Sequence, residues 1–215
     1  MRPHFPRAWL ITPHAPQEIF NCYASISPDD LIVAVDGGYA RCLELGLKPR
    51  IAIGDFDSIP PQLLEKIPSE CEIIAYPTEK DDTDTTLAVQ YCIQQGVLEI
   101  FICNDLMGRF DHSLALIQNL GLAQVSGVRC SVVSRTQLIT LIDKDMQYTY
   151  PQGTIISLLS ATPECSFSYS RGLQYPLDDL SVYNWQARCI SNVVTAGEQI
   201  IGISSGTAMI IITLP

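Results

Sequence analysis

Acidic side chains recur at short spacings in the first half of the chain. Asp55 and Asp57 flank a single residue in the segment 54–58, and Asp81 and Asp84 are three residues apart. In extended backbone, side chains two residues apart point to the same side, and residues three apart share one face of a helical turn. Crowded carboxylates repel one another, and a bound cation relieves that repulsion. Because Mg2+ is held by a few carboxylates together with substrate phosphates, these pairs predict a magnesium–phosphate site.

Other polar residues follow further apolar runs that are typical of strands. Asp36 comes directly after the run Leu31–Val35, and Arg109 and Asp111 lie just beyond the run Glu99–Cys103. In an open α/β sheet, ligands bind outside the carboxyl ends of the strands. We therefore expect several loops to deliver carboxylates to one rim, where Arg109 could hold a phosphate oxygen in bidentate fashion.

The acidic segment around Asp82 is also expected to begin a helix, which runs to Gln95 and ends at a glycine. Thr83 or Thr85 could cap this helix or touch a phosphate, and its N-terminus favours an anion. Acidic residues in loops equally serve as caps and turns. We assign Asp82 and Asp105 to that structural role.

Two kinds of apolar pattern divide the chain near residues 135–145. Before this point, continuous apolar strands alternate with helices, which is typical of a parallel sheet covered on both faces. After it, short strands are separated by turn signals and no helical period occurs, which indicates an antiparallel β-sandwich. We expect an α/β domain with a mainly parallel sheet at residues 1–138, then an all-β sandwich domain at residues 139–215. Expected strands are 8–12, 31–35, 51–53, 73–76, 99–103, 130–133, 138–142, 147–150, 154–159, 165–170, 190–194, 200–204 and 208–213, and expected helices are 39–45, 82–95 and 111–124.

The composition argues against several classes of protein. The 215 residues carry a net charge of -10 and no basic run, which disfavours nucleic-acid binding. No apolar run is long enough to span a membrane, and no signal-peptide core is present. The 8 cysteines include no Cys-x-x-Cys pair, which disfavours a zinc site and a disulfide framework. We expect a cytoplasmic protein with no membrane or nucleic-acid partner.

Common nucleotide and hydrolase motifs do not account for the chain. The sequence contains neither Gly-x-x-x-x-Gly-Lys-Ser/Thr nor Gly-x-Gly-x-x-Gly. Residues 202–206 match the nucleophile pattern Gly-x-Ser-x-Gly, but no histidine follows them to complete a hydrolase triad. We interpret this segment as a hairpin turn.

The order and spacing of the polar segments resemble the thiamine pyrophosphokinase family, from about Leu31 to the end of the chain. The elements extend across both halves, which makes the resemblance more specific than any one of them. They are Asp-Gly-Gly at 36–38, Leu-Gly-Leu-Lys-Pro at 45–49, Gly-Asp-Phe-Asp-Ser at 54–58, Lys-Asp-Asp-Thr-Asp at 80–84, Gly-Arg-Phe-Asp-His at 108–112, Gly-Leu-Gln-Tyr-Pro-Leu at 172–177 and Ile-Ser-Asn at 190–192.

The resemblance implies a homodimer that transfers pyrophosphate from ATP to the hydroxyl of thiamine, giving thiamine diphosphate and AMP. It implies that thiamine binds where domains of two subunits meet. The metal ligands would be Asp55, Asp57 and Asp81, and the nucleotide-binding residues Asp36, Gly37, Lys80, Thr83 and Arg109. Tyr175 and Ser191 would contact the thiamine ring, and the catalytic residues would be Asp84, Arg109 and Asp111. Either Asp111 or Asp84 would accept the proton of the thiamine hydroxyl.

Two departures and two alternatives accompany this resemblance. Met107 stands where the family often has glycine, and Gln174 replaces a frequent lysine. One alternative is a related pyrophosphokinase that acts on another hydroxymethyl heterocycle, such as a pterin. The other is a non-catalytic sensor of nucleotide or thiamine, against which the intact acidic segments argue.

Overall fold

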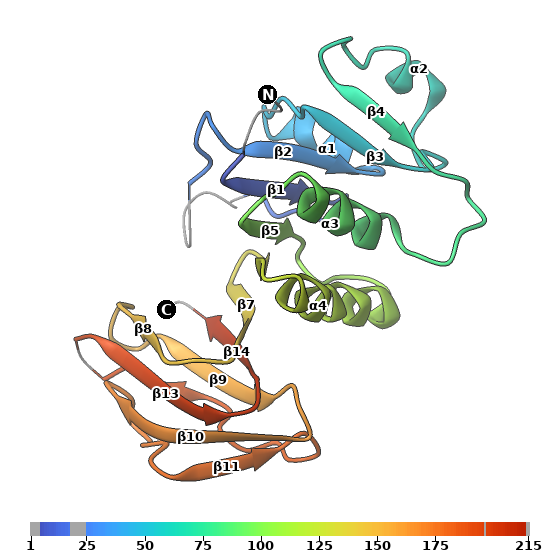
Figure 1. Cartoon of the computed structure of the whole chain (residues 1–215). Coiled ribbons are helices and arrows are strands. Elements are labelled where there is room, and N and C mark those ends of the chain that lie inside the picture. The colour runs from blue at the N-terminus through green and yellow to red at the C-terminus, as the bar shows by residue number, and fades with distance from the viewer. Residues whose placement is uncertain (1–4, 18–24, 196, 214–215) are drawn as a thin grey trace. The chain divides into compact units, whose positions relative to one another are not determined.

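The backbone divides into two units, at Met1–Arg135 and Thr136–Pro215, and each is described by itself (Figure 1). The computed structural model describes residues 5–17, 25–195 and 197–213. Cys22 lies outside these residues, and no disulfide joins the cysteines within them. No helix in the described ranges is long and apolar enough to cross a membrane.

In the described part of the first unit, six parallel strands form one sheet in the order β6-β5-β1-β2-β3-β4. The order reverses at β1, because β2 to β4 extend to one side of it and β5 and β6 to the other. Such a reversal is where open α/β sheets bind ligands. The strands are β1 (Arg7–Ile11), β2 (Leu31–Val35), β3 (Ile51–Gly54), β4 (Glu72–Ala75), β5 (Glu99–Cys103) and β6 (Arg129–Val133).

Helices connect these strands on both faces of the sheet. Helices α3 and α4 contact each other, and the handedness rule for crossovers between parallel strands puts α1 on the face opposite to them. The central strands are correspondingly buried on both sides, and Trp9 stacks on Phe101 with ring centroids 4.4 Å apart. The helices are α1 (Gly38–Glu44), α2 (Pro61–Leu64), α3 (Asp84–Gln94) and α4 (Phe110–Val125).

The start of α3 differs from the expected position. Thr83 accepts a hydrogen bond of 3.1 Å from the backbone N–H of Thr86, so that Thr83 is the N-cap and the helix begins at Asp84, two residues later than predicted. Asp81 and Asp82 therefore precede the helix. The predicted cap at Thr83 is confirmed.

In the described part of the second unit, two antiparallel sheets form the predicted β-rich region. Their strand orders are β12-β9-β14-β7 and β11-β10-β13-β8. Ala208, Ile210 and Ile212 alternate with more exposed residues along β14, and Phe167 and Ile201 are buried on the second sheet. The strands are β7 (Gln137–Ile142), β8 (Met146–Tyr148), β9 (Ile155–Ser160), β10 (Glu164–Arg171), β11 (Leu180–Tyr183), β12 (Asn192–Val193), β13 (Gln199–Ser205) and β14 (Ala208–Thr213).

The expected hairpin turn at residues 202–206 is wrong. Gly202 to Ser205 belong to β13, and the following turn leads to β14, which pairs in the other sheet. The segment is thus a connection between two sheets. The pattern of apolar residues predicts both strands, but it does not say whether neighbouring strands pair with each other.

Candidate active site

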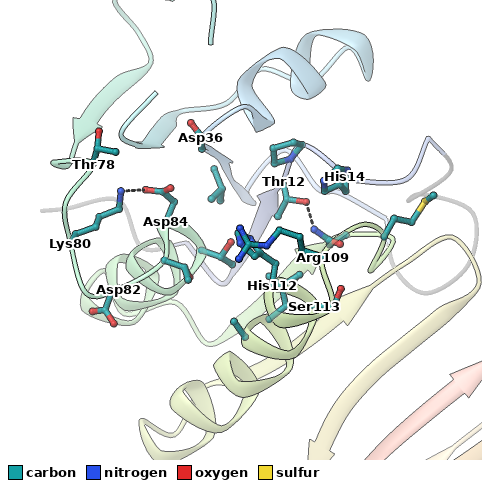
Figure 2. A pocket seen from close by; sticks show the side chains of 18 residues that line it. Thr12, His14, Asp36, Thr78, Lys80, Asp82, Asp84, Arg109, His112 and Ser113 are labelled. Carbon is teal, nitrogen blue, oxygen red and sulfur yellow. Dashed lines mark hydrogen bonds and ion pairs between the residues drawn. The ribbon is translucent and has the colours of Figure 1, made fainter. Parts of the chain in front are cut away.

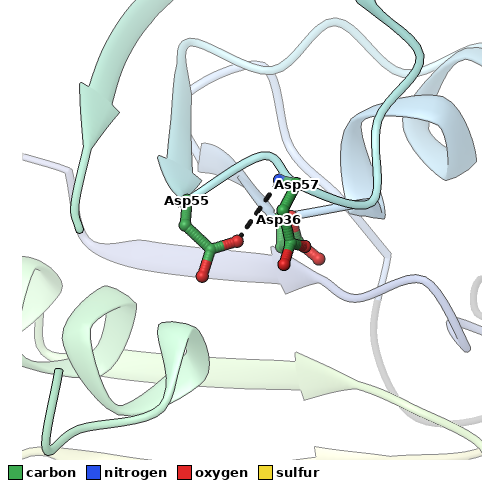
Figure 3. Close-up of side chains that lie close together, drawn as sticks. All are labelled: Asp36, Asp55 and Asp57. Atoms are coloured by element: carbon green, nitrogen blue, oxygen red, sulfur yellow. Dashed lines mark hydrogen bonds between the residues drawn. The ribbon is translucent and has the colours of Figure 1, made fainter. Parts of the chain in front are cut away.

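Three carboxylates converge at the carboxyl ends of β2 and β3. One oxygen from each of Asp36, Asp55 and Asp57 lies within 4.8 Å of the others (Figure 3). Asp36 is the first residue after β2, and Asp55 is the first after β3. The parallel pairing of these strands therefore brings together side chains that are far apart in the sequence.

The backbone around these carboxylates is closely packed and locally strained. Asp36 has φ +47° and donates its N–H to the carbonyl of Ile53 at 2.7 Å. A Cβ on Gly54 would lie 2.9 Å from the Cα of Asp36, so a larger residue would force the two strand ends apart. Phe56, between the two aspartates, has φ +58° and a buried ring. Positive φ at non-glycine residues persists only where the surroundings impose it, and it often marks functional sites.

Lys80 supplies the positive charge nearest to this group. Its Nζ donates to Asp55 Oδ2 at 2.6 Å and lies 3.2 Å from Asp84 Oδ1, and Figure 2 shows the Lys80 and Asp84 side chains facing each other. Burial acts to lower the pKa of Lys80, but its hydrogen bonds to Asp55 and Asp84 leave that pKa raised. The same hydrogen bond from Lys80 lowers the pKa of Asp55.

Two further carboxylates, Asp57 and Asp84, have pKa values that are raised instead. The charge on Asp55 raises the pKa of Asp57, and burial raises the pKa of Asp84 despite the nearby Lys80. A single lysine therefore compensates the carboxylates only in part.

The arrangement fits a divalent cation. Asp36 Oδ2 accepts a hydrogen bond of 2.7 Å from Ser58, but Asp36 Oδ1 is buried and has no hydrogen-bond partner among the described residues. An unpartnered carboxylate oxygen next to two further carboxylates matches the hard oxygen ligands that Mg2+ takes. Asp81 is exposed and is not a member of this three-carboxylate group of described residues. Its role as a metal ligand stays a prediction.

A cavity of about 470 Å³ opens beside the carboxylates in the first unit (Figure 2). Five of the predicted site residues line it, namely Asp36, Lys80, Thr83, Asp84 and Arg109. Gly37 is not among the lining residues and instead precedes α1 as its N-cap. The cavity also lies at the N-terminal ends of α3 and α4, where backbone N–H groups favour anions.

Arg109 and Asp111 form a two-point ion pair at the start of α4. Arg109 Nε donates to Asp111 Oδ1 at 3.1 Å, and its terminal nitrogen donates to Oδ2 at 2.5 Å. The hydrogen bonds from Arg109 lower the pKa of Asp111. Both side chains are exposed, so the same fork of donors is sterically free to take a phosphate instead.

Thr12 and Asn104 are among the lining residues that were not predicted from the sequence. Each is the first residue after a central strand, Thr12 after β1 and Asn104 after β5. Attention to every polar residue in that position, and not to acidic ones alone, would have found them.

The predicted thiamine-contacting residues lie close together in the second unit. The Asn192 side chain accepts from the backbone N–H of Tyr175 at 3.0 Å and donates to the Tyr175 carbonyl at 2.7 Å. Ser191, the preceding residue, has φ +59° and donates its N–H to Ser157 Oγ at 3.0 Å. Asn192 is buried, whereas Tyr175 is 60% exposed. The backbone of Tyr175 is therefore held in place while its ring remains available.

Comparisons with known proteins agree with these features. The family model "Thiamin pyrophosphokinase, catalytic domain" matches residues 23–132. Thiamine pyrophosphokinase of Bacillus subtilis is 29% identical over 172 residues, which are 75% of this chain and 77% of that protein. Thiamin pyrophosphokinase 1 of Caenorhabditis elegans is 28% identical over 175 residues, 73% of this chain and 67% of that protein.

Solved structures share the fold along nearly the whole chain. The crystal structure of thiamine pyrophosphokinase from Bacillus subtilis has a TM-score of 0.84 at 23% identity, with 96% of this chain and 99% of that chain covered. Yeast thiamin pyrophosphokinase has a TM-score of 0.74 at 18% identity, with 97% and 86% covered. These likenesses show a common architecture of the two units.

Proposed function

Because the chain belongs to the thiamin pyrophosphokinase family, we propose that it transfers the pyrophosphoryl group of ATP to the hydroxyl of thiamine, giving thiamine diphosphate and AMP. The observation that carries the proposal is the group Asp36, Asp55 and Asp57 beside a cavity that Lys80 and Arg109 also reach. Pyrophosphoryl transfer depends on positioning and charge compensation more than on covalent chemistry, and this site offers both.

Asp36, Asp55 and Asp57 would hold Mg2+, and the predicted ligand Asp81 would approach from the loop before α3. The cation would neutralise charge on the phosphates during transfer. The unpartnered Oδ1 of Asp36 and the raised pKa of Asp57 both support a group that gains stability when a cation binds.

Lys80, Thr83 and Arg109 bind the phosphates of ATP in this proposal. Thr83 lies at the positive end of α3, Lys80 extends from the preceding loop, and Arg109 lies at the start of α4. Arg109 exchanges its two-point contact with Asp111 for an equivalent contact with a phosphate.

Asp84 is the favoured acceptor for the proton of the thiamine hydroxyl. A general base is most effective when its pKa approaches the working pH, and burial raises the pKa of Asp84. Asp111, the other candidate, has a lowered pKa because it pairs with Arg109. We therefore place Asp84 in the catalytic role, with Asp111 holding Arg109 until the phosphates arrive.

Tyr175 and Ser191 would select the acceptor. Thiamine carries a cationic ring, and an exposed tyrosine face attracts such a ring by a cation–π interaction. The family resemblance implies thiamine bound where domains of two subunits meet, and we therefore propose a homodimer as the active form. Sedimentation or light scattering of the purified protein would measure that state.

The test is to incubate the protein with ATP, Mg2+ and thiamine and to measure AMP. We expect AMP and thiamine diphosphate in equal amounts, with neither formed when thiamine is omitted. A parallel reaction with a hydroxymethyl pterin addresses the alternative acceptor. AMP with the pterin alone would transfer the proposal to that substrate, and AMP with neither acceptor would overturn it.

A further inference from the structure

A buried hydrogen-bonded clasp joins the ends of β1 and β5. Thr12 Oγ1 donates to the carbonyl of Cys103 at 2.7 Å, and Asn104 Nδ2 donates to the same Thr12 Oγ1 at 2.8 Å. Thr12 is 3% exposed and Asn104 is 6% exposed. The order of strands in the sheet reverses between β1 and β5. These hydrogen bonds therefore join the two strand ends at the place where a ligand is expected to bind.

Asn104 also fixes the loop that follows it. Its Oδ1 accepts the backbone N–H of Leu106 at 2.7 Å, and its own N–H donates to the carbonyl of Val133 at 3.0 Å. Leu106 has φ +54°, a conformation that leucine adopts only where other contacts impose it. The Asn104 side chain is such a contact, because one end of its amide holds Leu106 and the other end is held by Thr12.

Asp105 anchors the loop a second time. Its N–H donates to the carbonyl of His14 at 2.9 Å, and its carboxylate accepts the backbone N–H of Arg135 at 2.7 Å and the Arg135 guanidinium at 3.0 Å. The Asp105 side chain is 11% exposed. Two consecutive residues after β5 are thus tied to the ends of β1 and β6. This is the structural role expected for Asp105.

Three residues, 106–108, separate these anchors from Arg109. Met107 and Arg109 are both exposed and line the cavity. The buried residues Thr12 and Asn104 line the same cavity. A bidentate contact between a guanidinium and a phosphate depends on the position and direction of the arginine. The buried clasp and Arg109 therefore line the same cavity and are connected by the short segment 105–108.

We propose that Thr12 and Asn104 are positioning residues, which hold the loop 105–109 so that Arg109 meets the triphosphate of ATP. The proposal rests on the proposed function for the identity of the nucleotide. Loss of the Thr12 hydroxyl leaves Asn104 Nδ2 without this partner in a buried place, and leaves the Cys103 carbonyl with only the longer bond of 3.4 Å from the Thr12 N–H. Asn104 then turns toward other partners and releases Leu106, and the loop that carries Arg109 loses its fixed shape.

The first experiment compares Thr12→Val, which keeps the shape of the side chain, with Thr12→Ser, which keeps the hydroxyl. Titration calorimetry with Mg-ATP measures binding, and steady-state rates give KM and kcat. For Thr12→Val we expect the Kd and KM for ATP to rise about tenfold with a smaller change in kcat, the size of one lost buried hydrogen bond. Thr12→Ser should remain within about twofold of the wild type. An unchanged Kd and KM in Thr12→Val would overturn the proposal.

The second experiment asks whether the effect acts through Arg109. In an Arg109→Ala background, Thr12→Val should add little further loss of Mg-ATP affinity, because the group to be positioned is already gone. An equal loss in both backgrounds would show that Thr12 contacts the nucleotide itself or supports the fold in general. That outcome would contradict a positioning role.

The third experiment is independent of any substrate. Amide hydrogen exchange on the ligand-free protein should be faster at residues 105–109 in Thr12→Val than in the wild type, and Thr12→Ser should match the wild type. Unchanged exchange in Thr12→Val would overturn the proposal even if the protein makes AMP. Conversely, no AMP together with the expected exchange would contradict the proposed function and leave the positioning role supported.

A variant of the second anchor covers the case in which Thr12→Val does not fold. Asp105→Asn keeps the shape of the side chain and weakens its contacts with Arg135. We expect the same direction of change in exchange and in Mg-ATP affinity, with circular dichroism confirming a native fold. A folded Asp105→Asn variant with unaltered exchange at residues 105–109 would count against the proposal.

Discussion

Lys80 donates a hydrogen bond of 2.6 Å to Asp55, and its ammonium also lies 3.2 Å from Asp84. One cation is thus shared between the loop after β3 and the first residue of α3. The Lys80 side chain is 15% exposed, so these interactions are shielded from solvent more than an ordinary surface pair. The protein thereby carries a positive charge of its own close to the place where Mg2+ is proposed to bind.

Replacing Lys80 should make the protein depend more strongly on Mg2+. In Lys80→Met, the carboxylates lose their compensating charge, and without metal we expect the midpoint of thermal unfolding to fall by about 2–4 °C, the change that roughly 1 kcal/mol produces in a protein of this size. The upward shift on adding Mg2+ should exceed that of the wild type. Lys66→Met, at an exposed lysine outside the site, is the control. An equal Mg2+ shift in wild type and Lys80→Met would contradict this role.

Asp57→Asn should abolish turnover and leave the fold intact. The substitution removes one carboxylate of the proposed metal site, so kcat should fall at least about a hundredfold, as the loss of a few kcal/mol of charge stabilisation requires. The fold should survive because Asp57 is exposed and its negative charge is repelled by that of Asp55, so the ionised side chain does not stabilise the fold. Asp143→Asn makes the same chemical change at an exposed turn of the second unit and should keep full activity. Near-normal turnover in Asp57→Asn would remove Asp57 from the metal site.

Asp84→Asn should be more stable than the wild type at neutral pH and inactive. Burial raises the pKa of Asp84 in the folded state, so its ionised form weakens folding at pH 7. As the pH falls through that raised pKa the cost disappears, and below the ordinary aspartate pKa of about 3.9 the two proteins should be equally stable. Urea unfolding in metal-free buffer at several pH values measures the difference. A stability gain that did not depend on pH would mean that ionisation is not its cause.

Stability should also fall at acid pH through Asp55. The hydrogen bond from Lys80 lowers the pKa of Asp55 in the folded state, so Asp55 stabilises the fold above the ordinary aspartate pKa and loses this contribution as the pH drops through the lowered one. In Asp55→Asn, the decline of stability below about pH 4 should therefore be shallower than in the wild type. Parallel acid unfolding curves for the two proteins would refute this assignment.

Tyr175 should affect thiamine and not ATP. Tyr175→Phe keeps the ring, and its KM for thiamine should stay within about twofold of the wild type, whereas Tyr175→Ala should raise it about tenfold, the size of a lost cation–π contact. The KM for ATP should be unchanged in both variants, because the residues proposed to bind the phosphates lie in the first unit. Trp185→Ala, at another exposed aromatic residue of the second unit, serves as the control. A parallel rise in both KM values would mean that Tyr175 supports the fold instead.

Sequence reasoning succeeded where burial alone determines the pattern. The apolar runs Leu31–Val35 and Ala208–Thr213 have the predicted bounds, because buried strands have to be continuously or alternately apolar. The rule that ligands gather at the carboxyl ends of parallel strands also predicted that Asp36 and Asp55 would lie on one rim. Both residues do follow neighbouring strands and come together.

Long-range contacts account for what the sequence did not predict. The hydrogen bond between Thr12 and Asn104 joins residues 92 positions apart, so it cannot be predicted from the spacing of neighbouring residues in the sequence. Strand β11 and helix α2 were not predicted. Strand β11 is short and pairs along β10, and α2 has four residues, which are too few to show a helical period. Asp81 and Asp84 were both expected on the first turn of a helix. Thr83 caps the helix, which begins at Asp84, so Asp81 lies before the helix and is exposed.

The packing of Gly54 against Asp36 has a consequence for how this protein can evolve. The spacing of the carboxylates is determined by the register of β2 on β3, in which Val35 lies opposite Ile53. Register changes only in whole-residue steps, and each step would turn the buried side chains of a strand toward the opposite face. Substitutions that gradually change the surrounding loops therefore leave the spacing of these carboxylates unchanged. Substitutions elsewhere in the chain can likewise accumulate while the distance between the three carboxylates stays constant.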